Sequence, residues 1–293
     1  MTTHLTAKPD VAVFFDKDSS TFSYVVKDPA SSSCAIVDSV LDFDYASGGT
    51  FHKSADDIID YVIAHKLKVE WLIETHVHAD HLSAAPYIQK KLGGKIGIGA
   101  QITTVQETFA KVFNEGADFL HDGSQFDYLF QDGEQFHIGD MPCTALHTPG
   151  HTPACFTHVL GDAVFVGDTL FMPDAGTARA DFPGGDAGIL FDSVQKILAL
   201  PEDHRIFMCH DYCPNGRELE YQTTVKAQRE QNIHVKQGIS KSTFVDLREA
   251  RDRTLSMPRL ILPSLQINMR AGHMPEPEDN GLSYLKIPLN AFK

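Results

Sequence analysis

The stretch Thr75-His76-Val77-His78-Ala79-Asp80-His81 decides the fold of this chain. It directly follows the apolar run Val69-Glu70-Trp71-Leu72-Ile73, which is typical of a buried strand. At the end of a strand a rigid scaffold meets an exposed loop, and chemistry is often found there. Imidazole nitrogens and carboxylate oxygens are ligands that first-row transition metals prefer. The stretch therefore predicts a metal site at the exit of a strand.

The spacing within this stretch gives its side chains a common direction. Alternate residues of a strand or tight loop point the same way, so we expect His76, His78 and Asp80 to face one side. We expect His81 to turn in as the next helix begins. The alternative is a polar loop that is merely rich in histidine. The density of ligand-type side chains at a strand exit favours the metal site.

The composition is that of a globular protein, and the length allows one large domain or a domain with an appendage. The chain has 293 residues, of which 42% are hydrophobic and 22% charged, and its net charge is -14. This charge argues against nucleic acid as a partner. No apolar run is long enough to span a bilayer, and residues 1–8 lack the pattern of a secretory signal or transit peptide. We expect a cytoplasmic protein with no membrane partner.

Five cysteines are scattered along the chain, and their odd number favours free thiols in a reducing compartment. Cys209 and Cys213 flank His210, which raises the question of a structural zinc site. No second pair with matching spacing accompanies them, so this role is disfavoured.

Hydrophobic periodicity predicts that helices and strands alternate in the first half and that short strands follow. We expect helices at residues 54–63, 81–92, 103–113 and 187–200. We expect strands at residues 11–15, 22–26, 34–38, 69–73, 95–98, 126–130, 134–138, 143–148, 156–160, 163–166 and 206–209. Helical and loop segments rich in charge and proline fill the chain beyond Glu218. This order indicates a sheet covered by helices.

Three further ligand-type residues follow predicted strands. They are His151 in Thr148-Pro149-Gly150-His151-Thr152, Asp168 in Gly167-Asp168-Thr169, and His210 in Cys209-His210-Asp211-Tyr212. Taken singly, each is explained by a core histidine or a turn-forming aspartate. Their repeated placement at strand exits instead predicts one site, assembled from several loops at the edge of a sheet sandwich.

These motifs, in this order, resemble the metallo-β-lactamase superfamily over residues 10 to about 215. The resemblance implies an α+β fold, a four-layer αββα sandwich with metal held at one edge of the sheets. We expect a single domain over residues 1–293. Residues 10–215 would form the catalytic core, and residues 216–293 a helical and loop extension covering the pocket. The superfamily includes lactamases, thioesterases, nucleases, flavoproteins and persulfide dioxygenases, so the fold does not settle the chemistry.

Four other segments resemble persulfide dioxygenases in particular. The loop at residues 171–186, with Arg179-Ala180-Asp181-Phe182, is similar to their Gly-x-x-Arg-x-Asp-Phe loop, and His210-Asp211-Tyr212 to their late His-Asp-Tyr element. The segments 272–281 and 284–288 resemble one bacterial branch of that family. The alternative for Arg179 and Asp181 is an ordinary surface ion pair.

The resemblance implies one Fe(II) per chain, held by His76, His151 and Asp168, and a reaction of glutathione persulfide with O2 that yields sulfite and glutathione. It places His78, Asp80, His81 and His210 around these ligands, where they would orient them or a bound water. Candidate substrate-binding residues are Arg179, Tyr212 and Arg217. The tail beyond Ser264 would either cover the pocket and contribute Arg270 or be solvated. Related enzymes are often dimers, so a homodimer is a further expectation.

The main alternative is a glyoxalase II-type thioesterase, which would hold two metals bridged by Asp168 and act on glutathione thioesters. All of its ligands are present in the sequence. A β-lactamase is disfavoured by His81, a nuclease by the acidic balance, and a non-catalytic protein by the complete ligand set.

Overall fold

The computed structural model describes residues 7–291 and shows two six-stranded sheets packed face to face. The first has the order β1-β2-β3-β6-β8-β9, with β1 Asp10–Asp16, β2 Thr21–Lys27, β3 Ser33–Val37, β6 Lys68–Ile73, β8 Lys95–Gly99 and β9 Tyr128–Phe130. The second has the order β10-β11-β12-β13-β14-β15, with β10 Glu134–Ile138, β11 Met141–His147, β12 Phe156–Leu160, β13 Ala163–Phe165, β14 Arg205–Phe207 and β15 Gln222–Thr224.

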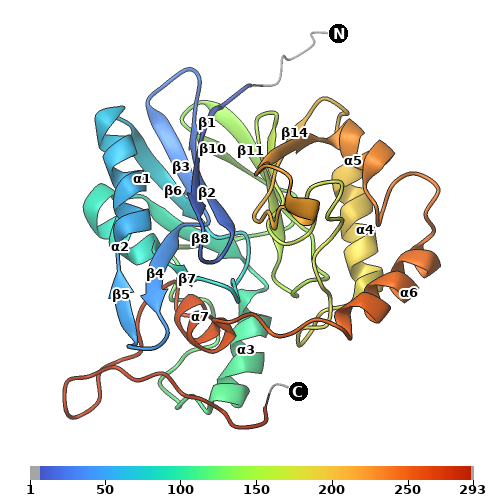
Figure 1. Cartoon of the computed structure of the whole chain (residues 1–293). Coiled ribbons are helices and arrows are strands. Elements are labelled where there is room, and N and C mark those ends of the chain that lie inside the picture. The colour runs from blue at the N-terminus through green and yellow to red at the C-terminus, as the bar shows by residue number, and fades with distance from the viewer. Residues whose placement is uncertain (1–6, 292–293) are drawn as a thin grey trace.

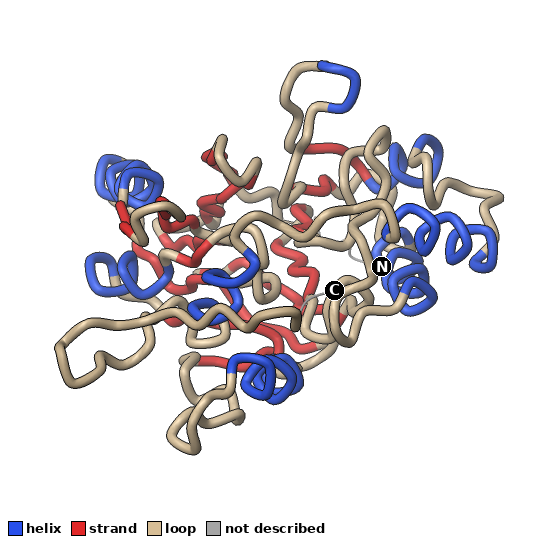
Figure 2. Tube along the Cα trace, turned by 60° about the horizontal axis from the view of Figure 1, so that its bottom comes forward, coloured by secondary structure: helices blue, strands red, loops and turns tan. Residues whose placement is uncertain are grey.

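Helices cover the outer face of each sheet. The helices are α1 Lys53–Ala64, α2 Ala85–Leu92, α3 Ile102–Phe113, α4 Ala187–Leu198, α5 Val225–Gln231, α6 Lys241–Asp252 and α7 Ile261–Asn268. Figure 1 shows α1 and α2 on one side of the sheets and α4, α5 and α6 on the other. The view in Figure 2 also places the strands between helices. The expected αββα sandwich is therefore confirmed.

Aromatic side chains join the two sheets. Tyr24 of β2 packs edge-on against Phe165 and Phe207 of the second sheet, with ring centroids 5.1 and 5.5 Å apart. Its hydroxyl donates a 2.6 Å hydrogen bond to the carbonyl of Met208, just beyond β14. Buried aromatic residues need such a partner for their polar end. This contact fixes the separation of the sheets close to the strand end that precedes His210.

The apolar faces of α1 and α4 are narrower than the sequence pattern predicts. Val62 and Leu190 are buried as expected. Ile63 is 61% exposed and Ile189 is 46% exposed, although both continue the helical spacing of apolar residues in the sequence. Successive helical residues are turned by about 100°, which carries the neighbour of a core residue to the edge of the stripe.

The segment after the histidine stretch also differs from the prediction. A helix does not begin at His81: Leu82–Ser83 form the short strand β7, which pairs with β4 Val40–Asp44, and α2 begins at Ala85. β4 also pairs with β5 Gly49–Phe51 in a small separate sheet. Pro86 lies in the first turn of α2, where a missing N–H costs nothing. His81 therefore stays in the loop beside the other ligand-type residues.

The chain beyond residue 215 is continuous with the sandwich. β15 pairs with β14 and completes the second sheet, and α6 packs against α4. The segment after α6 then crosses the molecule to α7, which lies against β7 and α3 (Figure 1). Among residues 7–291, no helix has the length and apolar character needed to cross a membrane.

We predict that Gly99→Ala destabilises the protein, because a Cβ atom at this buried position of β8 would overlap the ring of Phe156. Overpacking of this kind costs about 2 kcal/mol. Urea unfolding measures the loss. The matched control is Gly116→Ala, an exposed site with open space around the new methyl group, where the midpoint should stay unchanged. Equal midpoints for both variants would contradict the packing described here.

Candidate metal centre

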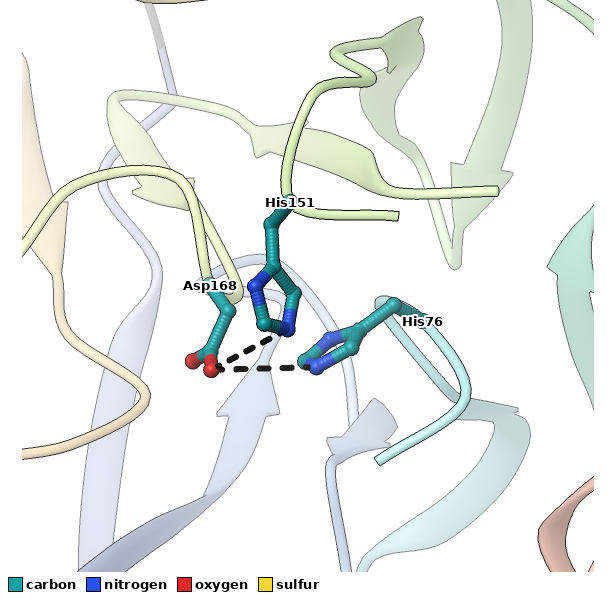
Figure 3. A group of neighbouring side chains, drawn as sticks. All are labelled: His76, His151 and Asp168. Carbon is teal, nitrogen blue, oxygen red and sulfur yellow. Dashed lines mark ion pairs between the residues drawn. The ribbon is translucent and has the colours of Figure 1, made fainter. Parts of the chain in front are cut away.

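Loops that follow β6, β11, β13 and β14 bring four ligand-bearing segments to one edge of the sandwich. Figure 3 shows His76, His151 and Asp168 pointing toward one another from three of these loops. The Oδ2 atom of Asp168 lies 4.0 Å from Nε2 of His76 and 3.6 Å from Nε2 of His151. Ligand atoms that each lie about 2.1 Å from one ion are separated by roughly 3 to 4 Å. The spacing of His76, His151 and Asp168 therefore fits the binding of one metal ion.

A second group lies on the other side of the same carboxylate. Oδ1 of Asp168 is 3.3 Å from Nε2 of His210, which in turn is 3.6 Å from Oδ2 of Asp80. His78, Asp80 and His81 form a group whose ligand atoms all lie within 4.8 Å of one another. Asp168 thus turns one oxygen toward His76 and His151 and the other toward His210.

Unpartnered polar atoms indicate that this centre is built for a cation. Among the buried polar atoms of the described residues that have no hydrogen-bond partner, five belong to this centre: Nε2 of His76, Nδ1 of His78, Nε2 of His81, Nε2 of His210 and Oδ1 of Asp168. Buried polar atoms are almost always hydrogen-bonded, since leaving one unsatisfied is costly. Nitrogen and oxygen donors concentrated in this way fit a transition metal.

The second nitrogen of several rings is fixed by a hydrogen bond. Nδ1 of His151 lies 2.8 Å from the carbonyl of Arg179, to which it can only donate. Nε2 of His78 lies 3.0 Å from Oδ1 of Asp38. These contacts hold the rings with the opposite nitrogen toward the centre, which is the usual arrangement around metal-binding histidines.

Thr21 arranges the second group in the same way. Its hydroxyl donates to Oδ2 of Asp80 at 3.0 Å and lies 3.4 and 3.3 Å from Nδ1 of His81 and His210. Nδ1 of His81 also lies 3.0 Å from Oδ2 of Asp80, and Nδ1 of His210 lies 3.2 Å from the carbonyl of Ser20, so both Nδ1 atoms can donate and both Nε2 atoms stay free. Sequence analysis missed Thr21 and Asp38. Asp38 directly follows β3, and that placement at a strand exit was the signal available.

The protonation states of His76 and His151 suit metal binding. Burial, together with the nearby charge of His78, lowers the pKa of His76, and burial also lowers the pKa of His151 despite Asp168. Both rings are therefore neutral at pH 7, the form that binds metals. Burial alone would raise the pKa of Asp80, but His210 and His81 outweigh it and lower this pKa.

The pKa values of His78 and His210 are raised, in contrast to those of His76 and His151. Burial alone would lower the pKa of His78, but Asp38 and Glu74 reverse this and raise it. The pKa of His210 is likewise raised against burial, by Asp168 and Asp80. The second group thus combines imidazoles and carboxylates that stabilise each other's charged forms.

The centre opens into a pocket of about 1010 Å³, which Asp80, His151, Asp168 and His210 line on one side. On the other side it is lined by residues of α6 and of the segment that follows, up to Arg259. A pocket of this size admits a small organic molecule. The extension therefore forms one wall of the candidate site.

Two of the three predicted substrate-binding residues line the pocket. Tyr212 and Arg179 line the pocket, whereas Arg217 is not among its lining residues. Arg179 holds Asp181 with two hydrogen bonds and the carbonyl of Ser256 with a third. The guanidinium of Arg217 is bonded to the carboxylates of Asp174 and Asp211. The substrate roles of these three residues stay predictions.

Other residues of the extension and the cysteines have structural roles. Arg270 pairs with Glu115 at 2.7 Å and does not line the pocket, so the alternative in which it contributes there is not supported. All five cysteines are free thiols, as expected. Cys209 lies beside Asp168 and His210, but its thiol donates to Oδ2 of Asp38 at 3.8 Å.

A buried ion pair ties the loop of Arg179 to α6. Arg248 donates to the carbonyl of Thr177 at 3.0 Å and to Asp252 at 2.9 Å. Oδ2 of Asp252 in turn accepts from the backbone N–H of Ala180 at 2.9 Å. The carbonyl of Arg179, which orients His151, therefore lies in a loop held from both sides by α6.

We predict that Asp168→Ala lowers bound metal more than tenfold, because it removes the one carboxylate that faces both groups. Mass spectrometry of the metals after gel filtration measures the content, and circular dichroism checks the fold. Asp18→Ala is the matched control, since Asp18 lines the same pocket and is exposed. Full metal content in the Asp168 variant would refute the assignment.

We predict that Asp252→Ala destabilises the protein by about 3 kcal/mol, because it leaves the buried guanidinium of Arg248 without its carboxylate. Chemical unfolding measures this loss. Asp246→Ala serves as the control, since Asp246 is an exposed residue of the same helix. A loss no greater than in the control would show that the pair does not anchor the loop.

Comparison with known proteins assigns the family. Residues 16–210 match the family model described as metallo-beta-lactamase superfamily. The chain is 54% identical to a probable metallo-hydrolase of Burkholderia pseudomallei, with 95% of this chain and 98% of that protein covered. It is 47% identical to glyoxylase B2 of Dictyostelium discoideum, with 98% and 99% covered.

Two matches with lower sequence identity carry the name ETHE1. The chain is 28% identical to the mitochondrial persulfide dioxygenase ETHE1 of Homo sapiens, with 88% and 87% covered. The crystal structure of ETHE1 from Myxococcus xanthus superposes with a TM-score of 0.71 and 26% identity, with 90% of this chain and all of that chain covered. With its two histidine groups on either side of Asp168, this chain belongs to the metallo-β-lactamase superfamily.

Proposed function

We propose that this chain is an iron-dependent persulfide dioxygenase, which converts glutathione persulfide, O2 and water into glutathione and sulfite. The observation that carries the proposal is the group of His76, His151 and Asp168, whose ligand atoms all lie within 4.8 Å of one another. Two histidines and one carboxylate are the ligand set of non-haem Fe(II) oxygenases. Bound there, Fe(II) would supply redox chemistry and open coordination positions for a sulfur anion and O2.

The surroundings of His78 support a three-residue ligand set. His78 gathers with Asp80 and His81, and also with Asp38 and Glu74, rather than with the group of His76. Its Nε2 atom lies 3.0 Å from Asp38 and 3.3 Å from Glu74. Two carboxylates beside Nε2 orient the ring, and among the described residues no ligand group that contains His78 also contains His76, His151 or Asp168. We infer that His78 orients its neighbours in the centre.

Other residues of the chain would position the substrate. Tyr212 stacks on the ring of His210, with ring centroids 5.8 Å apart, and lines the pocket beside Phe171. An aromatic wall next to Asp168 suits a polarisable sulfur group. His81 and His210, held by Thr21, would keep this side of the pocket rigid and polar.

A second candidate is a glyoxalase II-type thioesterase. The observation that favours it is the position of Asp168, whose two oxygens face different histidine groups, as a bridge between two metals would require. The two relatives with 54% and 47% identity are named as a probable metallo-hydrolase and as glyoxylase B2, and these names favour a hydrolase over a dioxygenase. His78, Asp80, His81 and His210 would then all be ligands.

Metal content and oxygen uptake separate the two reactions. The dioxygenase predicts about one iron per chain and uptake of one O2 per glutathione persulfide, with release of sulfite. The hydrolase predicts two metals and cleavage of S-lactoylglutathione without O2 uptake. An oxygen electrode, a sulfite assay and metal analysis of the same sample decide between them.

His81→Gln sharpens this test, because only the hydrolase needs His81 as a ligand. The dioxygenase predicts that the variant keeps its one iron, whereas the hydrolase predicts a fall from two metals to one. His151→Gln is the matched control, since both candidates lose metal there. Two metals in the active wild-type protein, with thioester cleavage, would overturn the dioxygenase proposal.

A further inference from the structure

Four arginines line the pocket that opens from the metal centre: Arg179, Arg248, Arg251 and Arg259. Two of them are used within the protein. Arg179 is bonded to Asp181 and to the carbonyl of Ser256. Arg248 is bonded to Asp252 and to the carbonyl of Thr177. Their guanidinium N–H groups are bonded within the protein, so these two side chains are structural parts of the pocket wall.

Arg251 and Arg259 differ from this pair. Within residues 7–291, neither guanidinium makes a hydrogen bond or an ion pair, and both residues are exposed. Their positive charges nevertheless contribute to lowering the pKa of one nearby residue each. The pKa of His234, which also lines the pocket, is lowered by burial and then by Arg248 and Arg251. The pKa of Asp44 is lowered mainly by hydrogen bonds from Ser47 and Ala46, with Arg259 adding a smaller effect.

Two unpaired cations at a pocket are notable because this chain is strongly acidic. It has 39 acidic and 25 basic residues. An anion approaching such a protein is repelled by the overall charge and needs a local positive region to bind. The same pocket is lined by four aspartates: Asp18, Asp80, Asp168 and Asp174. The extension therefore adds cationic residues to a pocket whose core residues are largely acidic.

We propose that Arg251 and Arg259 bind the carboxylates of an anionic, thiol-derived substrate and so determine which sulfur compounds the metal centre accepts. The guanidinium group matches a carboxylate with two parallel hydrogen bonds. Glutathione conjugates carry two carboxylates remote from sulfur, one for each arginine. This inference rests on the proposed function only in the identity of the substrate, since both candidate reactions use a glutathione derivative.

Binding of S-methylglutathione to the metal-loaded full chain tests this role, because the probe cannot react as a persulfide or as a thioester. Isothermal titration should show that Arg251→Gln and Arg259→Gln each raise Kd about tenfold, the value of one charge-assisted carboxylate contact. Arg253→Gln is the matched control. Arg253 is exposed on the same segment, donates to the carbonyl of Glu249 and does not line the pocket. Its Kd should change less than about twofold.

Two further measurements make the test specific. The diethyl ester of the probe should bind the wild type weakly, and the Arg251→Gln/Arg259→Gln double variant should bind it no worse. Added salt should weaken binding to the wild type more than to the double variant. Unchanged urea midpoints would show that the variants fold.

An unchanged Kd in the double variant, or a wild type that fails to bind the probe, would overturn the proposal. Because no turnover is needed, this result is separate from the oxygen uptake and thioester assays. A protein with neither activity could still show the predicted dependence on Arg251 and Arg259.

Discussion

The carboxylate of Asp168 is the constraint on which the rest of the structure depends. It is buried between two groups of histidines and has one oxygen toward each. A buried carboxylate is stable only when charge or hydrogen bonds compensate it. The sandwich provides this compensation by ending several strands at one edge, so that the loops after β6, β11 and β14 contribute ring nitrogens around it. The arrangement of the strands thus supplies the charge compensation that the buried Asp168 carboxylate requires.

The part of the chain beyond residue 215 is integral to this site. Asn268, the last residue of α7, donates to the backbone carbonyls of His78 and His81 at 2.9 and 2.8 Å. Its side-chain oxygen accepts from the N–H of Ser83. α6 meanwhile holds the loop that orients His151. Two of the ligand-bearing loops are therefore kept in place by helices that contain no ligand.

Strand periodicity and strand exits are local signals, and they predicted most strands of the two large sheets and one site at a sheet edge, but not β4, β5, β7 or β15. The αββα sandwich and the set of His76, His151 and Asp168 came from the resemblance to the superfamily. Sequence reasoning did not predict Thr21 or Asn268, whose contacts join residues 189 and 190 positions apart. A threonine or asparagine has no distinctive local pattern. The sequence offered the ion pair of Arg179 with Asp181 only as an alternative, and it did not indicate the pairing of Arg217. Nor did it show that Arg251 and Arg259 have no partner among residues 7–291, since ion pairing depends on the folded geometry.

The hydrogen bonds from Asn268 also set an order of events during synthesis. The histidine stretch leaves the ribosome long before Asn268 is made, and until then the carbonyls of His78 and His81 lack the partner seen in the folded protein. The loop gains its final shape only when nearly the whole polypeptide has been translated. An ion held by this loop would therefore meet the loop in its final shape only after the segment that contains Asn268 has been translated.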